Sequence, residues 1–548
     1  MSGTLDPVTL AILKGRLEQI ADEMDVTLYR SAFNPIIAEA RDACHGLYHA
    51  QTGDTLVQGT SGLPIFVGTM AFAVRAVIAK VARDGGLQPG DTFLFNDPYE
   101  AGTHLNDMRL VRPVFRHGAL FCWMASAGHW LDLGGNVPGG YNPRATESFQ
   151  EGVRIPPVKL IVAGQMNHDI LDILAAHSRV PASNWGDLNG QLNALDLGER
   201  RFNRLLDEYG EDTVASAFTI LSDRAEVLMQ DAITALPDGH YAFEDVLDND
   251  GITDEMLTVA LDLTVAGSSM TLDFSRSSAA PAGPVNISYS TTVAACYVAL
   301  KHVFTAVPAN AGCLRPIAFV VPDSSLLSAT APRPVAGYTE TILRLIGVVF
   351  GALAQADPAR AMAAPFGTIN ALSMAGHRED GSRWVMFSFF GGGLGGTAEG
   401  DGPSHANNPI STATMPPAEI LEAAYPVLFT QWALRPGSHG PGRFRGGLGA
   451  VYEIEALRDA RVSLLGERGK AAPFGVGGGG SAALNRFTWQ EDGAVHTPPM
   501  VSKITDVTLH AGCRIRLETP GGGGWGDPAD RAPDAQARDI RLGYVVAP

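Results

Sequence analysis

The sequence predicts a multidomain α+β protein with mixed, largely antiparallel sheets and helices packed on them. Apolar residues recur with helical spacing in the first 235 residues, whereas alternating apolar and polar residues mark antiparallel strands over 239–274. Farther along, glycine clusters separate long apolar stretches, which is typical of strands joined by tight turns. Because 548 residues are enough for two or more cores, we expect an N-terminal domain (1–235), a β-rich middle region (236–335) and a glycine-rich, β-rich C-terminal domain (336–548).

The N-terminal domain is expected to combine helices with hairpins. After Asp6-Pro7, apolar side chains spaced by 3.6 residues from Val8 to Met24 predict a helix. Strand-like runs that flank short turns predict two antiparallel hairpins. One hairpin pairs strands at 43–50 and 55–58, and the other pairs strands at 110–115 and 119–125. Helices are also expected at 67–83 and in segments between 188 and 235.

Strands dominate the expected structure beyond residue 235. The segment from Leu257 to Val265 alternates strictly, which predicts a half-exposed antiparallel strand. A helix is expected from about 291 to 304, followed by a structured loop at 310–316. Because apolar stretches separate the glycine clusters, we expect tight turns and close backbone packing there, not disorder. These clusters lie at 391–396, 446–449, 477–480 and 521–526.

The composition argues against several classes of protein. A formal net charge of -18 without a cluster of Lys or Arg disfavours a protein that binds nucleic acids or anionic membranes. The first residues lack a basic segment followed by an apolar run, so we expect no signal peptide, and we find no uninterrupted apolar run long enough to span a bilayer. Five scattered cysteines without a CxxC pair suit a reducing compartment, so we expect a cytoplasmic protein with buried thiols.

Two glycine-rich segments match nucleotide motifs only in part. Residues 391–396 fit GxGxxG, but Gly and Pro fill the next segment, 397–403, where the dinucleotide fingerprint needs a helix. Residues 466–471 have the wrong spacing for a Walker A loop and lack its Ser or Thr. We therefore expect no nucleotide site on this chain.

One predicted hairpin gathers residues that bind metals. Its two strands fold about a turn at His117, which places the start of the first strand beside the end of the second. Asp107 and His129 then become cross-strand neighbours, about 5 Å apart at Cα. His104 lies three residues before Asp107 in a Pro/Gly-rich loop, and Asp42 lies at the mouth of the preceding hairpin.

We predict that Asp42, His104, Asp107 and His129 hold a divalent metal. A mixed set of imidazole and carboxylate ligands suits Zn, Mn or Fe better than Ca or Mg. The alternative is that each is an ordinary polar loop residue, such as an aspartate that caps a turn. Three further histidines nearby are expected at exposed strand or turn positions; they are His45, His49 and His117.

Motifs that carry a family resemblance follow one another along almost the whole chain. They are NDPYEAGTHLND at 96–107, GHWLDLGG at 128–135, QEGVRIPP at 150–157, NAGCLRP at 310–316, GRFRGGLG at 442–449 and TPGGGGWGDP at 519–528, with shorter matches at 6–9, 39–42, 145–147, 186–188, 539–540 and 543–544. Together they resemble the hydantoinase B/oxoprolinase family, the metal-bearing half of ATP-dependent cyclic-amide hydrolases and of certain ketone carboxylases.

The resemblance implies a division of labour between two subunits. The four predicted ligands match the positions of the family's metal ligands. A larger partner of the hydantoinase A type would bind ATP-Mg, in a heterotetramer or larger complex. ATP would phosphorylate the amide oxygen of a small cyclic amide, and the metal on this chain would activate water.

Four further residues are candidates for the chemistry. Asp132, three residues beyond the last predicted ligand, is expected to act as general base or to orient a ligand, with a turn cap as the alternative. Glu39 is a second catalytic candidate at the mouth of the first hairpin. Glu147 and Arg154 are expected to line the substrate cleft, Arg154 facing an anionic intermediate, with a solvated surface as the alternative for both.

The chain departs from the family pattern at two places. Residues 62–68 have the sequence GLPIFVG, without two histidines that many members have in this stretch. Tyr338 and Gly347 stand where we expect Asn and Asp, on either side of the matching Glu340 and Arg344. We expect these changes to reshape a substrate pocket and to spare the metal site.

Three functions follow from these observations. The first is a subunit of an ATP-dependent hydrolase that opens a hydantoin, a lactam or 5-oxoproline. The second is a subunit of an ATP-dependent ketone carboxylase, which substrate profiling of a reconstituted complex would distinguish. The third is a structural subunit with an architectural metal, since four protein ligands are typical of closed structural sites.

Overall fold

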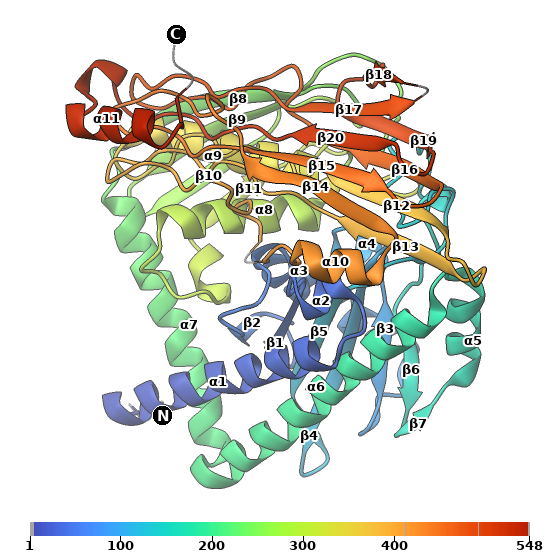
Figure 1. The fold of residues 1–548 in the computed structure, drawn as a ribbon. Helices are drawn as coiled ribbons and strands as arrows, with labels where there is room; N and C mark the ends of the chain where they lie inside the picture. The colour runs from blue at the N-terminus through green and yellow to red at the C-terminus, as the bar shows by residue number, and fades with distance from the viewer. Residues whose placement is uncertain (1–4, 412, 492, 546–548) are drawn as a thin grey trace.

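The computed structural model describes residues 5–411, 413–491 and 493–545 (Figure 1). Over these residues the fold is α+β, with four mostly antiparallel sheets and packed helices, which confirms the predicted class. Besides the elements placed below, the described chain contains α2 (Pro35–Ala38), α4 (Pro98–Ala101), α5 (His168–His177), α10 (Ala418–Ala424), α11 (Pro533–Arg541) and short 3-10 turns at Ser148–Gln150, Ala311–Leu314 and Pro528–Asp530.

A seven-stranded sheet organises the N-terminal part, with the strand order β2-β1-β5-β4-β3-β6-β7. Helices α1 and α6 pack on one face and α3 packs on the other, so both faces are buried. The strands are β1 (Ala43–His49), β2 (Thr55–Gln58), β3 (Thr92–Phe95), β4 (Asp107–Arg116), β5 (Ala119–His129), β6 (Val158–Val162) and β7 (Gln165–Met166), and the helices are α1 (Pro7–Ser31), α3 (Pro64–Asp84) and α6 (Pro181–Tyr209).

The N-terminal helices form where the apolar spacing predicts them, with longer bounds. Helix α1 starts at Pro7 because the Asp6 carboxylate accepts the backbone N–H groups of Val8 and Thr9, both at 3.0 Å. The helical stretch predicted between 188 and 235 is two helices, α6 and α7 (Glu211–Thr234). Gly210 separates them with a φ of 83°, a conformation that glycine adopts without strain.

The middle region contains a four-stranded sheet of order β11-β10-β9-β8, in which only β10 and β11 are parallel. Helix α9 packs on β8 and β9, and α8 packs between α9 and α3, so these helices join the middle sheet to the N-terminal part (Figure 1). The elements are β8 (Gly239–Leu247), β9 (Leu257–Ala266), β10 (Ser269–Asp273), β11 (Ile317–Val320), α8 (Tyr289–Val303) and α9 (Tyr338–Ala356).

Two helices, α3 and α9, are long and apolar enough to cross a membrane by length and composition alone. Within the protein, 83% of the most apolar 18-residue segment of α9 is buried, and 50% of the corresponding segment of α3. The apolar character of α9 is therefore that of a core helix, which is buried on nearly all sides.

Two further sheets form the C-terminal part and enclose their own buried cluster. Their strand orders are β13-β12-β16-β19 and β14-β15-β20-β17-β18. The glycine clusters pack backbone against backbone as expected, since a Cβ at Gly446 would lie 1.8 Å from the Gly522 carbonyl oxygen. The strands are β12 (Ala371–His377), β13 (Arg383–Ser388), β14 (Val427–Leu434), β15 (Ala450–Ala456), β16 (Ala460–Leu465), β17 (Arg486–Glu491), β18 (Ala494–His496), β19 (Lys503–Leu509) and β20 (Arg514–Glu518).

One buried hydrophobic cluster runs through all three predicted domains. It includes Phe66 from the N-terminal part, Leu261 from the middle region, and Leu345 and Phe387 from the C-terminal part. The close packing of α3 on α8 needs Gly68, because a Cβ there would lie 2.7 Å from the Cβ of Ala294. The boundaries near 235 and 335 stay predictions, and among the described residues the buried cluster continues across both of them.

Candidate metal centre

The hairpin of β4 and β5 has the register that the sequence predicts. Asp107, the first residue of β4, pairs with His129, the last residue of β5. The turn residue His117 has a φ of 49° and an exposed side chain, as expected of the tip of a hairpin. On the other side of β5, the His129 N–H donates to the Asp42 carbonyl at 3.2 Å, which brings the start of β1 to the same edge.

Three of the predicted ligands form a compact buried group. Oδ1 of Asp107 lies 2.9 Å from Nε2 of His104 and 3.1 Å from Nδ1 of His129. The two imidazole rings are stacked with centroids 5.1 Å apart. Among the described residues these are the three His, Cys, Asp or Glu side chains whose ligand atoms come within 4.8 Å of one another.

Backbone geometry and a buried arginine hold the loop that carries His104. Gly102 and Thr103 both have positive φ, 62° and 114°, which turns the chain sharply between α4 and β4. Nη1 of Arg109 donates to the Asp107 carbonyl at 2.9 Å, and Nη2 donates to Oγ1 of Thr103 at 2.6 Å. The arginine is completely buried, so it fixes the loop from within.

The two histidines keep the Asp107 carboxylate ionised in spite of its burial. Burial alone would raise the pKa of Asp107, but the two adjacent imidazoles hold it below its ordinary value. Burial raises the pKa of Asp42 to about 7, His129 opposes that shift, and Asp107 adds to it. Asp42 is thus an electrostatic neighbour of the group, and its role as fourth ligand stays a prediction.

The donor set fits a divalent metal. Nε2 of His129 and Oδ1 of Asp42 are both buried without a hydrogen-bond partner. Unpartnered buried polar atoms cost free energy unless a ligand or ion satisfies them. Two imidazoles and a carboxylate are ligands that Zn, Mn and Fe accept, so His104, Asp107 and His129 would hold the metal.

Aromatic rings from three segments that are far apart in the sequence pack against this group. Tyr338, at the start of α9, lies 4.8 Å from the His104 ring, and Phe387, on β13, lies 5.1 Å from the His129 ring. Tyr141 stacks on Phe387 at 4.6 Å with nearly parallel planes, and it lies 5.1 Å from the His104 ring. The rings shield the group from solvent, and both histidines are only 1% exposed.

The contacts of Asp132 are those of a turn cap. Its Oδ1 accepts the backbone N–H groups of Gly134 at 3.1 Å and Arg179 at 2.9 Å. Its Oδ2 accepts the N–H of Gly139 at 3.0 Å and Nη1 of Arg179 at 2.8 Å. Because both oxygens are occupied, the geometry favours the capping alternative, and the base role stays a prediction.

The structure does not bring the remaining candidates into the buried group. Glu39 and Glu147 have exposed side chains, which matches the solvated alternative for Glu147. Arg154 is half-buried, lies 3.7 Å from the Asp97 carboxylate and stacks over the Tyr99 ring at 5.3 Å. Asp97 caps α4 by accepting the Tyr99 N–H, so Arg154 supports the helix that leads into the His104 loop.

Comparison with known proteins identifies the family. A sequence model described as hydantoinase B/oxoprolinase matches residues 6–528. The chain belongs to this family. The beta subunit of the caprolactamase of Pseudomonas jessenii is 31% identical over 565 residues, which cover 99% of this chain and 94% of the relative. The putative D-/L-hydantoinase of Pseudomonas sp. (strain NS671) has a B-type subunit that is 28% identical over 556 residues, 99% of this chain and 93% of the relative.

Two solved structures have the same fold. The crystal structure of the ATP-dependent caprolactamase from Pseudomonas jessenii matches with a TM-score of 0.89 at 31% identity, covering 99% of this chain and 95% of that chain. The nucleotide-free structure of acetone carboxylase matches with a TM-score of 0.91 at 21% identity, covering 99% of this chain and 78% of that chain. At that identity the second likeness concerns the fold alone.

The expectation that His45 lies at an exposed position is wrong. His45 is completely buried on β1, and its Nδ1 lies 2.7 Å from Oδ1 of Asp25 on α1, which is buried as well. The sequence contained a signal for this pair, because Asp25 falls on the apolar stripe of α1 between Met24 and Leu28. A carboxylate at such a position needs a buried partner.

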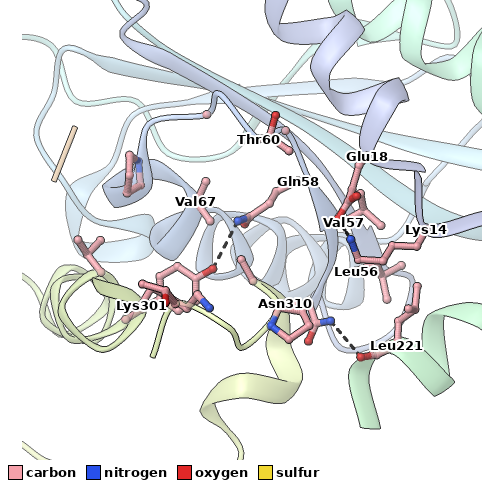
Figure 2. Close-up of a pocket in the computed structure, with 18 of the residues that line it drawn as sticks. Lys14, Glu18, Leu56, Val57, Gln58, Thr60, Val67, Leu221, Lys301 and Asn310 are labelled. Atoms are coloured by element: carbon pink, nitrogen blue, oxygen red, sulfur yellow. Dashed lines mark hydrogen bonds and ion pairs between the residues drawn. The ribbon is translucent and has the colours of Figure 1, made fainter. Parts of the chain in front are cut away.

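A separate cavity of about 550 Å³ lies where α1, β2, α8 and the 305–310 loop meet (Figure 2). Gln58 reaches across it, and its Nε2 donates to the hydroxyl of Tyr297 at 3.4 Å. A Lys14–Glu18 ion pair also lies among the lining residues. The three residues of the buried group are not in this lining.

Proposed function

We propose that the chain is the B-type subunit of an ATP-dependent cyclic-amide hydrolase that opens a hydantoin, a lactam or 5-oxoproline. The observation that carries the proposal is the buried group of His104, Asp107 and His129 at the end of the β4–β5 hairpin. Membership of the hydantoinase B/oxoprolinase family and the similarity to the beta subunit of the caprolactamase support this choice of reaction.

The residues of the group have distinct tasks in this proposal. A divalent metal, Mn, Zn or Fe, would supply Lewis acidity and lower the pKa of a water molecule there. His104 and His129 offer nitrogen ligands, and Asp107 offers the carboxylate between them. Arg109 and Thr103 fix the loop, while Tyr141, Tyr338 and Phe387 exclude bulk water from the site.

ATP-Mg and a second subunit complete the proposed enzyme. We propose a hydantoinase A-type partner that binds ATP-Mg, in a heterotetramer or larger cytoplasmic complex. The names of the two relatives support a partner, since each is named as one subunit of an enzyme. Phosphorylation of the amide oxygen by the partner would make the amide carbon more electrophilic, so that water adds there and the ring nitrogen leaves as an amine. A second water would then release phosphate from the acyl phosphate that remains.

The test is substrate profiling of the chain reconstituted with a hydantoinase A-type partner, ATP, Mg and Mn or Zn. We expect ATP-dependent ring opening of caprolactam, hydantoin or 5-oxoproline, lost in His104→Ala and kept in His117→Ala, whose histidine is exposed at the hairpin tip. A bicarbonate-dependent product from a ketone, without ring opening, would favour the carboxylase. Ring opening that persists in metal-free His104→Ala would favour an architectural metal.

A further inference from the structure

Helix α6, which packs on β5, presents a buried polar stripe of Asn184, Asp187 and Gln191. These residues are three and four positions apart, so they lie on one face of the helix. Asn184 is 4% exposed and the other two are completely buried, whereas polar side chains on a packed helix usually face solvent. Burial of polar groups is costly unless they are hydrogen-bonded, so their partners show what the stripe does.

Gln191 bonds to the chain directly after two candidate ligands. Its Nε2 donates to the Met108 carbonyl at 3.1 Å, and its Oε1 accepts Nε1 of Trp130 at 3.1 Å. Met108 follows Asp107 and Trp130 follows His129. The stripe therefore faces the backbone that carries the metal group.

Asp187 reaches the same backbone through a second buried side chain, Asn34. Oδ1 of Asp187 accepts the backbone N–H groups of Phe33 and Asn34 at 2.8 Å and 3.2 Å, and Oδ2 accepts Nδ2 of Asn34 at 2.8 Å. The same Nδ2 also donates to the carbonyl of His129 at 2.9 Å. Asp187 and Asn34 are both completely buried, so solvent does not compete for these bonds.

The oxygen of the Asn34 amide holds the segment that leads to Asp42. Oδ1 of Asn34 accepts the N–H groups of Ile36 and Ile37 at 2.7 Å and 3.3 Å, which caps α2. In the turn after α2, the Asp42 N–H donates to the Ile36 carbonyl at 3.0 Å. A rotated amide would set the NH₂ group of Asn34 against two N–H donors, so the amide has one favourable orientation.

We propose that Asn34 and Asp187 are positioning residues of the metal group, which fix the place of Asp42 relative to His129. Asn34 ties the turn after α2 to the His129 carbonyl, and the His129 N–H returns to the Asp42 carbonyl at 3.2 Å. Asp187 holds the Asn34 amide in the orientation that these bonds need. This inference rests on the metal site of the proposed function, and it accounts for the placement of Asp42 beside ligands from another hairpin.

Zinc binding to the full chain tests this role without any measurement of activity. Equilibrium dialysis of the metal-free protein against Zn²⁺ gives the Kd, and thermal unfolding gives the Tm. Asn34→Ser keeps an oxygen that can cap α2 but loses both Nδ2 bonds, so we expect the Kd to rise about tenfold or more. Asp187→Asn places an N–H donor against the Asn34 amide and should raise the Kd by a similar factor.

Asp91→Asn is the matched control. Asp91 is also completely buried, and its two oxygens accept backbone N–H groups at 2.8 Å and 2.9 Å. It precedes β3, whose other end, Phe95, pairs with Arg109 close to the metal group. We therefore expect this variant to have a lower Tm and the Kd of the wild type.

The outcomes separate this inference from the proposed function. Asn34→Ser with a lower Tm and the Kd of the wild type would show a purely structural role and overturn the inference, while the proposed function would stand. An equal rise of the Kd in Asp91→Asn would overturn it too, because the loss would then follow from lower stability alone. A wild-type protein without saturable zinc binding would overturn the metal site of the proposed function and this inference with it. If Asp187→Asn does not fold, Asn34→Ser decides.

Discussion

At the residue scale, the candidate ligands are held in place by the protein alone. Asp107 bridges the two histidines through one oxygen, and the cross-strand pairing with His129 fixes their separation. Arg109 fixes the preceding loop through Thr103 and the Asp107 carbonyl. A site organised in this way needs little rearrangement when a metal binds.

Removal of one imidazole should release the metal without unfolding the chain. We expect His104→Ala to lower the metal affinity roughly tenfold or more, because a three-residue set loses one ligand. Elemental analysis of the purified protein measures the metal, and circular dichroism reports the fold. His117→Ala removes an exposed histidine and should keep the metal of the wild type. Equal metal content in both variants would contradict the assignment.

Glu340 should make the folded state less stable as the pH rises. Burial raises its pKa from 4.5 to about 8, so between these values the folded state keeps a proton that the unfolded state has released. The free energy of unfolding therefore falls as the pH rises through this window and is unaffected by Glu340 below it. Glu340→Gln mimics the neutral form and should flatten this dependence.

Denaturant unfolding at pH 5, 7 and 8.5 measures the effect. Glu379→Gln is the control, because that side chain is 83% exposed, and it should follow the pH dependence of the wild type. Parallel curves for wild type and Glu340→Gln would show that Glu340 is not protonated in the folded protein.

At the element scale, local pairing was predictable and distant packing was not. The β4–β5 hairpin follows from two apolar runs and one turn, so the register of Asp107 and His129 could be predicted. Helix α9 was not predicted, because its residues are buried on nearly all sides, Glu340 and Arg344 included, so no solvent-exposed polar face marks it in the sequence. The walls of the site come from three segments far apart in sequence, and only Tyr338 was singled out, as a departure from the family pattern.

The turn after β5 should depend on Asp132. We expect Asp132→Asn to destabilise the protein by about 1–3 kcal/mol, because the side chain loses its charge-assisted bond to Arg179 and one acceptor for a backbone N–H. Thermal unfolding measures this loss. The reconstituted complex, corrected for folded protein, should retain most of its activity. A Tm like that of the wild type with activity lowered a hundredfold would instead support the base role.

At the scale of the whole molecule, the three predicted domains share one core. The buried cluster joins Phe66, Leu261, Leu345 and Phe387, and α8 lies between α3 and α9. A chain divided near residue 235 would expose the face of α3 that packs on Ala294 of α8. Because that face is apolar, its exposure is unfavourable, and the N-terminal sheet depends on the rest of the chain for its stability.

The full chain should therefore unfold as one cooperative unit. We expect a single calorimetric transition, and a fragment of residues 1–235 should bind a hydrophobic dye and lack sharp thermal unfolding. The candidate metal ligands all lie within that fragment, but Tyr338 and Phe387, whose rings pack against the two histidines, do not. The fragment should consequently bind metal more weakly than the full chain. A fragment with its own sharp transition and full metal affinity would show that the boundary near 235 separates two autonomous domains.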